Sequence, residues 1–317
     1  MSATGPLVRQ ATNDSGNAWI LGTTFFLFSA LCWGMNVPMM TRLFATWDPY
    51  FLSPLRVLIA SMALALLVVL TGGVRELAWS IRPGRAFLLA LPLAVFFFFY
   101  ALGLQFSNPI TAAAIMAGSP VYAALTLRLL TGARLERGFV PAAALTGIGA
   151  WIAVQGRPAL AGASFGVGGG ELLMLLALIA WNIYSIGAQR WFPPDTSQLR
   201  RTYVVTLAAL PWLLVAWLCA WGSGIAGAPR LDPGAEAIIL LLVTAVFATG
   251  LASYTWNLGV ERAGLAAGSL WQNMVPIFAV LVSMLYGIFP TIQQVIGGAI
   301  VLCGVLYMQW RRIRQGM

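Results

Sequence analysis

The feature that most limits how this chain can fold is a run of 42 residues without a charged side chain, residues 86–127. As one helix it would be about 63 Å long, roughly twice the hydrocarbon core of a bilayer. The run therefore predicts two membrane spans. The break is expected at Asn108 and Pro109, because proline lacks the backbone N–H and disfavours helix in the residue before it. A second uncharged run, 263–310, is expected to break at 287–290.

Composition agrees with a membrane location, since 60% of the 317 residues are hydrophobic and only 9% are charged. A soluble domain of this length does not have such a balance. The predicted fold class is an all-α integral membrane protein with ten transmembrane helices. The expected helices are 18–41, 51–71, 86–105, 111–130, 139–156, 170–191, 201–221, 237–258, 265–286 and 291–310.

The basic residues, all eighteen of them arginines, predict the orientation. Fourteen fall in the termini and in alternate loops, which the positive-inside rule assigns to the cytoplasm together with both termini. Three, Arg42, Arg157 and Arg230, fall on the other side. Arg56 lies inside the second span, and we expect its side chain to extend toward the membrane surface rather than to reach a substrate carboxylate.

The chain repeats itself in outline. The interval between Gly103 and Pro120 recurs between Gly259 and Pro276, and the interval between Gly149 and Gly156 recurs between Gly297 and Gly304. Five spans per half is an odd number, so a second copy must enter the membrane from the opposite face. The predicted domains are an N-terminal cytoplasmic tail (1–17), two inverted five-helix repeats (18–156 and 170–310), a linker (157–169) and a basic cytoplasmic tail (311–317).

Loop charges support this inversion. The loop after the fourth span carries Arg134, Glu136 and Arg137, whereas the loop after the ninth, residues 287–290, carries none. Equivalent loops thus exchange charge when they exchange side, as an inverted repeat requires.

The order of these motifs resembles the drug/metabolite transporter superfamily, specifically its EamA-type members. The resemblance rests on Trp33, Gly34 and Asn36 with Pro38 in the first span, and on the repeated glycines and prolines. The aromatic run 96–100 is similar to bacterial aromatic amino acid exporters. The resemblance implies a bacterial inner-membrane exporter of amino acids or related metabolites, without an ATP-binding module.

Prolines within two equivalent spans indicate where a substrate would bind. Pro120 and Pro276 leave the carbonyls of Met116 and Gln272 without helical partners, so these groups could accept hydrogen bonds from a substrate ammonium. The alternative is that each proline only kinks its helix. Pro38, Pro120 and Pro276 are the expected kink or hinge residues.

Polar and aromatic side chains at membrane depth complete the expected cavity, because lipid cannot satisfy amide groups. Their alternative role is a hydrogen bond between helices. The candidate cavity residues are Trp33, Asn36, Tyr100, Met116, Ser119, Trp181, Tyr184, Tyr254, Asn257, Trp271 and Gln272.

Other functions lack the residues they need. The chain has no histidine and no carboxylate pair at depth, so we expect no enzyme, metal or cofactor. No ionisable side chain is expected at the centre of a span, and Glu76, Glu171 and Glu261 are expected to be solvated charges at helix ends. This argues against a proton-coupled antiporter of cationic drugs and for a uniporter or facilitator, or for a coupling that the sequence does not locate. The arginines are too scattered for a nucleic acid.

The expected function is a secondary transporter that exports aromatic or other hydrophobic amino acids from the cytoplasm by alternating access and without ATP. The expected partners are therefore a small-molecule substrate, an amino acid, and the lipid bilayer. A purine, a sugar derivative or a drug is the alternative substrate. The glycines of spans five and ten predict scaffold helices, with a dimer interface as the alternative to a monomer.

Overall fold

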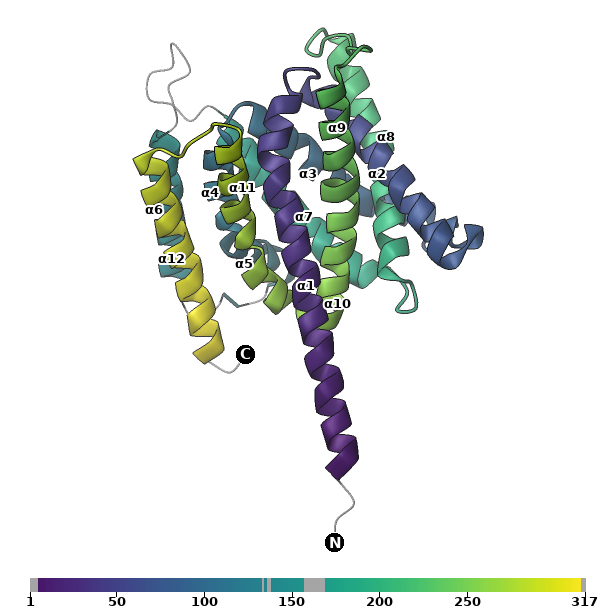
Figure 1. Ribbon diagram of the computed structural model, residues 1–317, viewed down its shortest axis with the longest axis vertical. Helices are drawn as coiled ribbons and strands as arrows, with labels where there is room; N and C mark the ends of the chain where they lie inside the picture. The colour runs from purple at the N-terminus through teal and green to yellow at the C-terminus, as the bar shows by residue number, and fades with distance from the viewer. Residues whose placement is uncertain (1–4, 133, 136–137, 157–168, 315–317) are drawn as a thin grey trace.

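The computed structural model describes residues 5–132, 134–135, 138–156 and 169–314, which form a bundle of helices (Figure 1). The first half contains α1 (Gly5–Leu43), α2 (Pro49–Gly72), the 3-10 helix η1 (Val74–Leu77), α3 (Pro83–Gln105), α4 (Pro109–Ala117), α5 (Ser119–Thr131) and α6 (Phe139–Gln155). The second half contains α7 (Gly170–Trp191), α8 (Gln198–Gly222), α9 (Ala235–Val243), the π-helix η2 (Thr244–Leu251), α10 (Ala252–Trp271), α11 (Met274–Leu285) and α12 (Ile292–Arg314).

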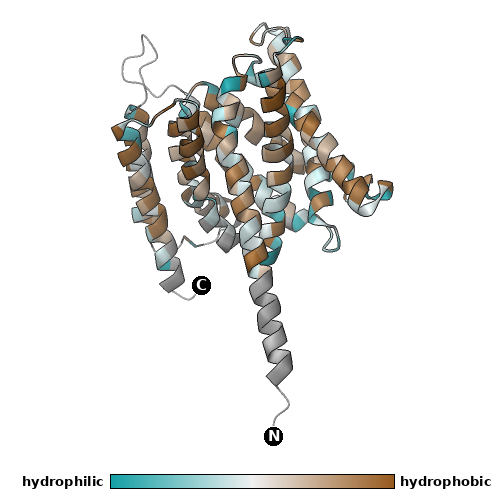
Figure 2. Ribbon diagram, in the orientation of Figure 1, coloured by the Kyte–Doolittle hydropathy of each residue, from teal (hydrophilic) through white to brown (hydrophobic). Residues whose placement is uncertain are grey.

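The bundle is that of a multi-pass membrane protein. Among the described residues six helical stretches are long and apolar enough to span a bilayer, and α4 with α5, bent by 52°, makes a seventh. Three shorter apolar helices, α6, α11 and α12, accompany them. Figure 2 shows hydrophobic residues along the helices and hydrophilic ones mainly near their ends. The predicted linker, 157–169, lies outside the described residues except for Gly169.

The helix boundaries differ most from the prediction at two places in the chain. The first helix begins at Gly5, thirteen residues before the expected position 18, because no proline interrupts the chain between Pro6 and Pro38; its apolar part does begin at Ala18. The predicted loop before residue 265 is absent, because α10 continues to Trp271.

The chain bends where that loop was expected. Gly259 and Gly268 both lie against the ring of Phe26. Nine residues of straight helix would separate them by about 13 Å, so α10 curves between them.

Both mid-span prolines lie at helix breaks. Pro120 lies in the first turn of α5, directly after the bend at Gly118, and Pro276 lies in the first turn of α11. A proline in this position gives up an N–H that has no helical partner anyway. Pro38, by contrast, lies inside α1, which continues through it.

The expectation of free carbonyls at these breaks was wrong. The carbonyl of Gln272 accepts a hydrogen bond from the N–H of Val275 at 3.1 Å. At the other break, the N–H of Gly118 caps the carbonyls of Ile115 and Met116. Both breaks are therefore closed by tight turns that use the acceptors which proline leaves.

Helices of the two halves alternate in the bundle. α1 packs against α10 and α11, α3 against α7 and α8, and α2 against α8 and η2. α6 packs against α12 at one edge of the bundle, as expected for scaffold helices (Figure 1). The start of α1 and the end of α12 lie toward the same end of the molecule.

Glycines bring α6 and α12 into backbone contact. A Cβ atom on Gly149 would lie 2.5 Å from the carbonyl oxygen of Gly297 and 2.8 Å from the backbone nitrogen of Val301. Neither neighbour is a flexible side chain, so only glycine fits at this position.

We expect Gly149→Ala to destabilise the protein by about 1–3 kcal/mol, because the added methyl group forces the two backbones apart. Thermal unfolding of the purified protein in detergent measures the effect. Gly147→Ala is the matched control, since nothing lies within 4 Å of its Cβ position, and it should raise stability by up to about 1 kcal/mol through helix propensity. Equal melting temperatures for the two variants would contradict the close packing of these helices.

Candidate functional site

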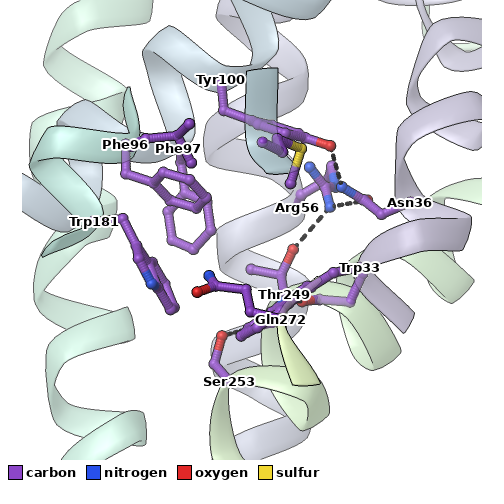
Figure 3. Close-up of a pocket in the computed structure, with 13 residues that line it drawn as sticks. Trp33, Asn36, Arg56, Phe96, Phe97, Tyr100, Trp181, Thr249, Ser253 and Gln272 are labelled. Carbon is purple, nitrogen blue, oxygen red and sulfur yellow. Dashed lines mark hydrogen bonds between the residues drawn. The ribbon is translucent and has the colours of Figure 1, made fainter. Parts of the chain in front are cut away.

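A small pocket lies between the two halves of the chain, and residues of α1, α2, α3, α4, α7, η2 and α10 line it (Figure 3). Its volume is about 50 Å³, which is room for a few water molecules. A metabolite enters only if the helices around it move apart. The lining residues are Trp33, Asn36, Arg56, Phe96, Phe97, Tyr100, Met116, Leu178, Trp181, Ala248, Thr249, Ser253 and Gln272.

Arg56 is the one ionised side chain among these lining residues. Only 5% of its surface is exposed. Its Nη2 atom donates to Asn36 Oδ1 at 2.6 Å, to the Thr244 carbonyl at 3.1 Å and to Thr249 Oγ1 at 3.0 Å. The expectation that this side chain extends to the surface was wrong, because neighbouring helices offer it acceptors that lipid lacks.

The π-helix η2 supplies part of this polar environment. A π-helix shifts the backbone hydrogen-bond register, and such segments are frequent at functional sites. The carbonyl of Thr244 accepts from Arg56 and from Thr249 Oγ1, and the carbonyl of Ala248 accepts from Trp33 Nε1 at 3.0 Å. The irregular segment therefore presents its backbone to an arginine and an indole of the other half.

Aromatic rings form the opposite wall of the pocket. Trp181 packs against Phe96 and Trp33, with ring centroids 5.0 and 5.5 Å apart, and Phe96 also packs against Tyr100 at 5.7 Å. Such contacts hold the rings in place. An apolar wall facing a cation with hydrogen-bonding neighbours suits a ligand with an aromatic body and an anionic end.

Asn36 joins the cation to the aromatic wall. Its Oδ1 accepts from Arg56, and its Nδ2 donates to the hydroxyl of Tyr100 at 3.0 Å. This one amide therefore fixes an arginine of α2 and a tyrosine of α3 relative to α1.

The structure brings together six of the eleven predicted cavity residues. Lining the pocket are Trp33, Asn36, Tyr100, Met116, Trp181 and Gln272. The other five, Ser119, Tyr184, Tyr254, Asn257 and Trp271, lie outside this lining.

One of the residues outside the pocket forms a bond between helices. Asn257 Nδ2 donates to Thr202 Oγ1 at 2.8 Å, and the buried Tyr184 lies beside Asn257. The observed contact of Asn257 is therefore a hydrogen bond between helices, which was the alternative to a role in the cavity.

Sequence reasoning missed seven of the lining residues. The aromatic run 96–100 was a signal that could have indicated Phe96. The position of Arg56 within a span was a signal for that residue. Nothing in the sequence pattern indicated that Thr249 and Ser253 face the pocket, because that depends on the π-helix. The missed residues are Arg56, Phe96, Phe97, Leu178, Ala248, Thr249 and Ser253.

Glu171 is buried, with 5% of its surface exposed, so its expected role as a solvated charge was wrong. It lies in the first turn of α7, where the positive end of the helix favours a carboxylate. It lines a separate groove with Tyr122 and Thr146. Glu261 is exposed, and Glu76 pairs with Arg200 at 2.9 Å.

No group of three potential metal ligands lies together in the described part of the chain.

We expect Asn36→Leu to lower the stability by about 2–3 kcal/mol, because it removes a charge-assisted bond from Arg56 and a donor from Tyr100. Unfolding in detergent, followed by tryptophan fluorescence, measures the loss. Asn182→Leu is the control, since among the described residues Asn182 bonds the Leu178 carbonyl of its own helix and no other helix, and its cost should stay within about 0.5 kcal/mol. A similar loss in both variants would contradict the central position of Asn36.

Comparison with known proteins places the chain among transporters. It is 23% identical over 251 residues to the "Uncharacterized transporter YyaM" of Bacillus subtilis (strain 168), a match that covers 78% of this chain and 80% of that protein. A solved structure described as "Crystal structure of protein" has the same fold, with a TM-score of 0.66 and 22% identity over 95% of this chain and 99% of that one.

The sequence profile of the EamA-like transporter family matches twice, at residues 20–155 and 168–310. The two matches divide the chain at the boundary between its halves. The chain belongs to the EamA-like transporter family.

Proposed function

We propose that this protein is a secondary transporter of the inner (plasma) membrane that exports small aromatic or other hydrophobic carboxylates, aromatic amino acids among them, by alternating access. The observation that carries the proposal is the pocket between the halves, where an aromatic wall faces the buried Arg56. The ring of such a substrate fits the wall, and its carboxylate fits the guanidinium. The direction of transport follows from the resemblance to exporters.

The proposed scaffold is a pair of inverted five-helix repeats with ten spans. Reciprocal contacts between α6 and α12 support it. Gly149 lies against Gly297 and Val301, while Gly297 lies against Gly149 and Ala153. Ala153 follows Gly149 by four residues, as Val301 follows Gly297, so each helix makes the same contacts on the other. Such reciprocity is what a twofold axis produces.

A second pair of contacts repeats in the same way. α3 lies on α7 through Gly103, which lies against the backbone of Gly170 and Met174. Correspondingly, α10 lies on α1 where Gly259 meets Phe26. The third span of each half thus packs on the first span of the other, through equivalent glycines. Two such halves can exchange conformations and expose the pocket to each side of the membrane in turn.

The lining of the pocket fits the alternative substrates less well than an aromatic carboxylate. A phosphate-bearing sugar derivative needs more than one cation, and Arg56 is alone in the lining. The indoles and amides leave a purine as the second candidate.

We expect saturable flux of radiolabelled phenylalanine into liposomes that contain the purified protein. Trp181→Leu should reduce the flux about tenfold or more, because it removes the ring that contacts both Phe96 and Trp33. Trp19→Leu is the control, since that indole is 53% exposed, and should transport normally. Undiminished flux in the Trp181 variant would mean that the substrate does not use this wall.

The proposed orientation has both termini in the cytoplasm. In a cysteine-free background, Ser223→Cys should react with a membrane-impermeant maleimide added to intact cells, because the α8–α9 loop is placed outside. Gly84→Cys, exposed at the start of α3, should react only after lysis. The opposite pattern would reverse the proposed topology.

A further inference from the structure

The charge of Arg56 has no carboxylate partner in the part of the chain that the structure describes. All three of its hydrogen bonds go to neutral acceptors, and its Nε atom is buried without a hydrogen-bond partner. A guanidinium does not lose its proton in a protein. A buried cation without a counter-charge is unfavourable, so the pocket lacks one negative charge.

The described carboxylates lie elsewhere. No aspartate or glutamate lines the pocket. Asp48 accepts a hydrogen bond from the backbone of Phe51 and caps α2, and Glu171 lines the other groove. Glu236 and Glu76 pair with Arg42 and Arg200. The missing charge must therefore come from the occupant of the pocket.

A substrate ammonium would find only neutral acceptors in this lining. The backbone carbonyls of Thr244, Ala248 and Gln272 already accept from Arg56, Trp33 and Val275, which leaves side-chain groups such as the Gln272 amide and the Ser253 hydroxyl. With its carboxylate on Arg56, an amino acid would also hold its own cation close to the guanidinium, since the two groups share one carbon atom. In a site of low dielectric this repulsion is strong.

We propose that the pocket selects its ligand by net charge, and that its preferred substrate is an aromatic monocarboxylate without an ammonium group. The carboxylate binds Arg56 beside Asn36 and Thr249, and the ring lies against Trp181, Phe96 and Trp33 (Figure 3). A zwitterionic amino acid with the same ring binds more weakly, because it brings no net negative charge. This inference rests on the proposed function and narrows its substrate class.

Three ligands that share a phenyl ring and its first two chain carbons test it: 3-phenylpropanoate (an anion), phenylalanine (a zwitterion) and 2-phenylethylamine (a cation). Isothermal titration of the purified full-length protein in detergent at neutral pH measures each affinity. We expect the anion to bind at least about tenfold more tightly than phenylalanine, which is the scale of one charge-assisted contact. The amine should not bind.

Variants of Arg56 test the cause of this order. Arg56→Gln should weaken the binding of 3-phenylpropanoate about tenfold or more, so that it no longer binds more tightly than phenylalanine. Arg56→Lys should keep the order of the three affinities, because it keeps the charge. Gel filtration reports whether each variant is folded. If Arg56→Gln does not fold, the order of the three affinities on the unmodified protein still tests the proposal.

Each outcome separates the inference from the proposed function. Tighter binding of phenylalanine than of 3-phenylpropanoate would overturn the charge selection and leave the carboxylate carrier intact. Binding of the amine, or an unchanged order in a folded Arg56→Gln variant, would also overturn it. If none of the three ligands binds or is transported, the proposed function itself fails.

Discussion

The hydrocarbon core of a bilayer contains no water, so a buried polar group in this chain is satisfied only by another part of the chain. That constraint connects its helices. Ser29 on α1 donates to the Ala252 carbonyl at 3.0 Å and lies 2.7 Å from the hydroxyl of Thr255. Asn36 joins α1 to α2 and α3. Apolar packing holds the helices together, but these bonds specify which face of each helix points inward.

In the pocket this satisfaction is incomplete at a charged group. The amide of Asn36 is satisfied at both ends, whereas the guanidinium of Arg56 keeps a buried Nε atom without a partner. Its acceptors on η2 are available because the π-helix departs from the regular helical register. A binding site in a membrane protein needs such an incompletely paired group, since a fully paired interior has nothing to offer a polar ligand.

The sequence predicted features that follow from covalent structure or from a single side chain. Helix breaks at Pro120 and Pro276 follow from the missing N–H, and Trp33 and Asn36 belong to the pocket because an indole N–H and an amide cannot face lipid. Arg56 was misplaced because its acceptor in η2 lies 188 residues away in the chain, and no pattern marks η2 as a π-helix. The Gln272 carbonyl was judged free because a proline shows which N–H is lost and not which neighbour replaces it.

Packing is repeated between the halves, whereas the polar groups are not. Asn36 follows Trp33 by three residues, and Tyr184 follows Trp181 by three. Yet Asn36 bonds the cation at the pocket, whereas Tyr184 lies beside Asn257 outside it. Arg56 belongs to α2, and two of its acceptors belong to η2. A motion that separates α2 from η2 therefore removes those two acceptors and leaves Asn36 as the remaining one. If an anion occupies Arg56 as proposed, its carboxylate replaces the lost acceptors, so the charge of the occupant would affect the energy of opening as well as the affinity.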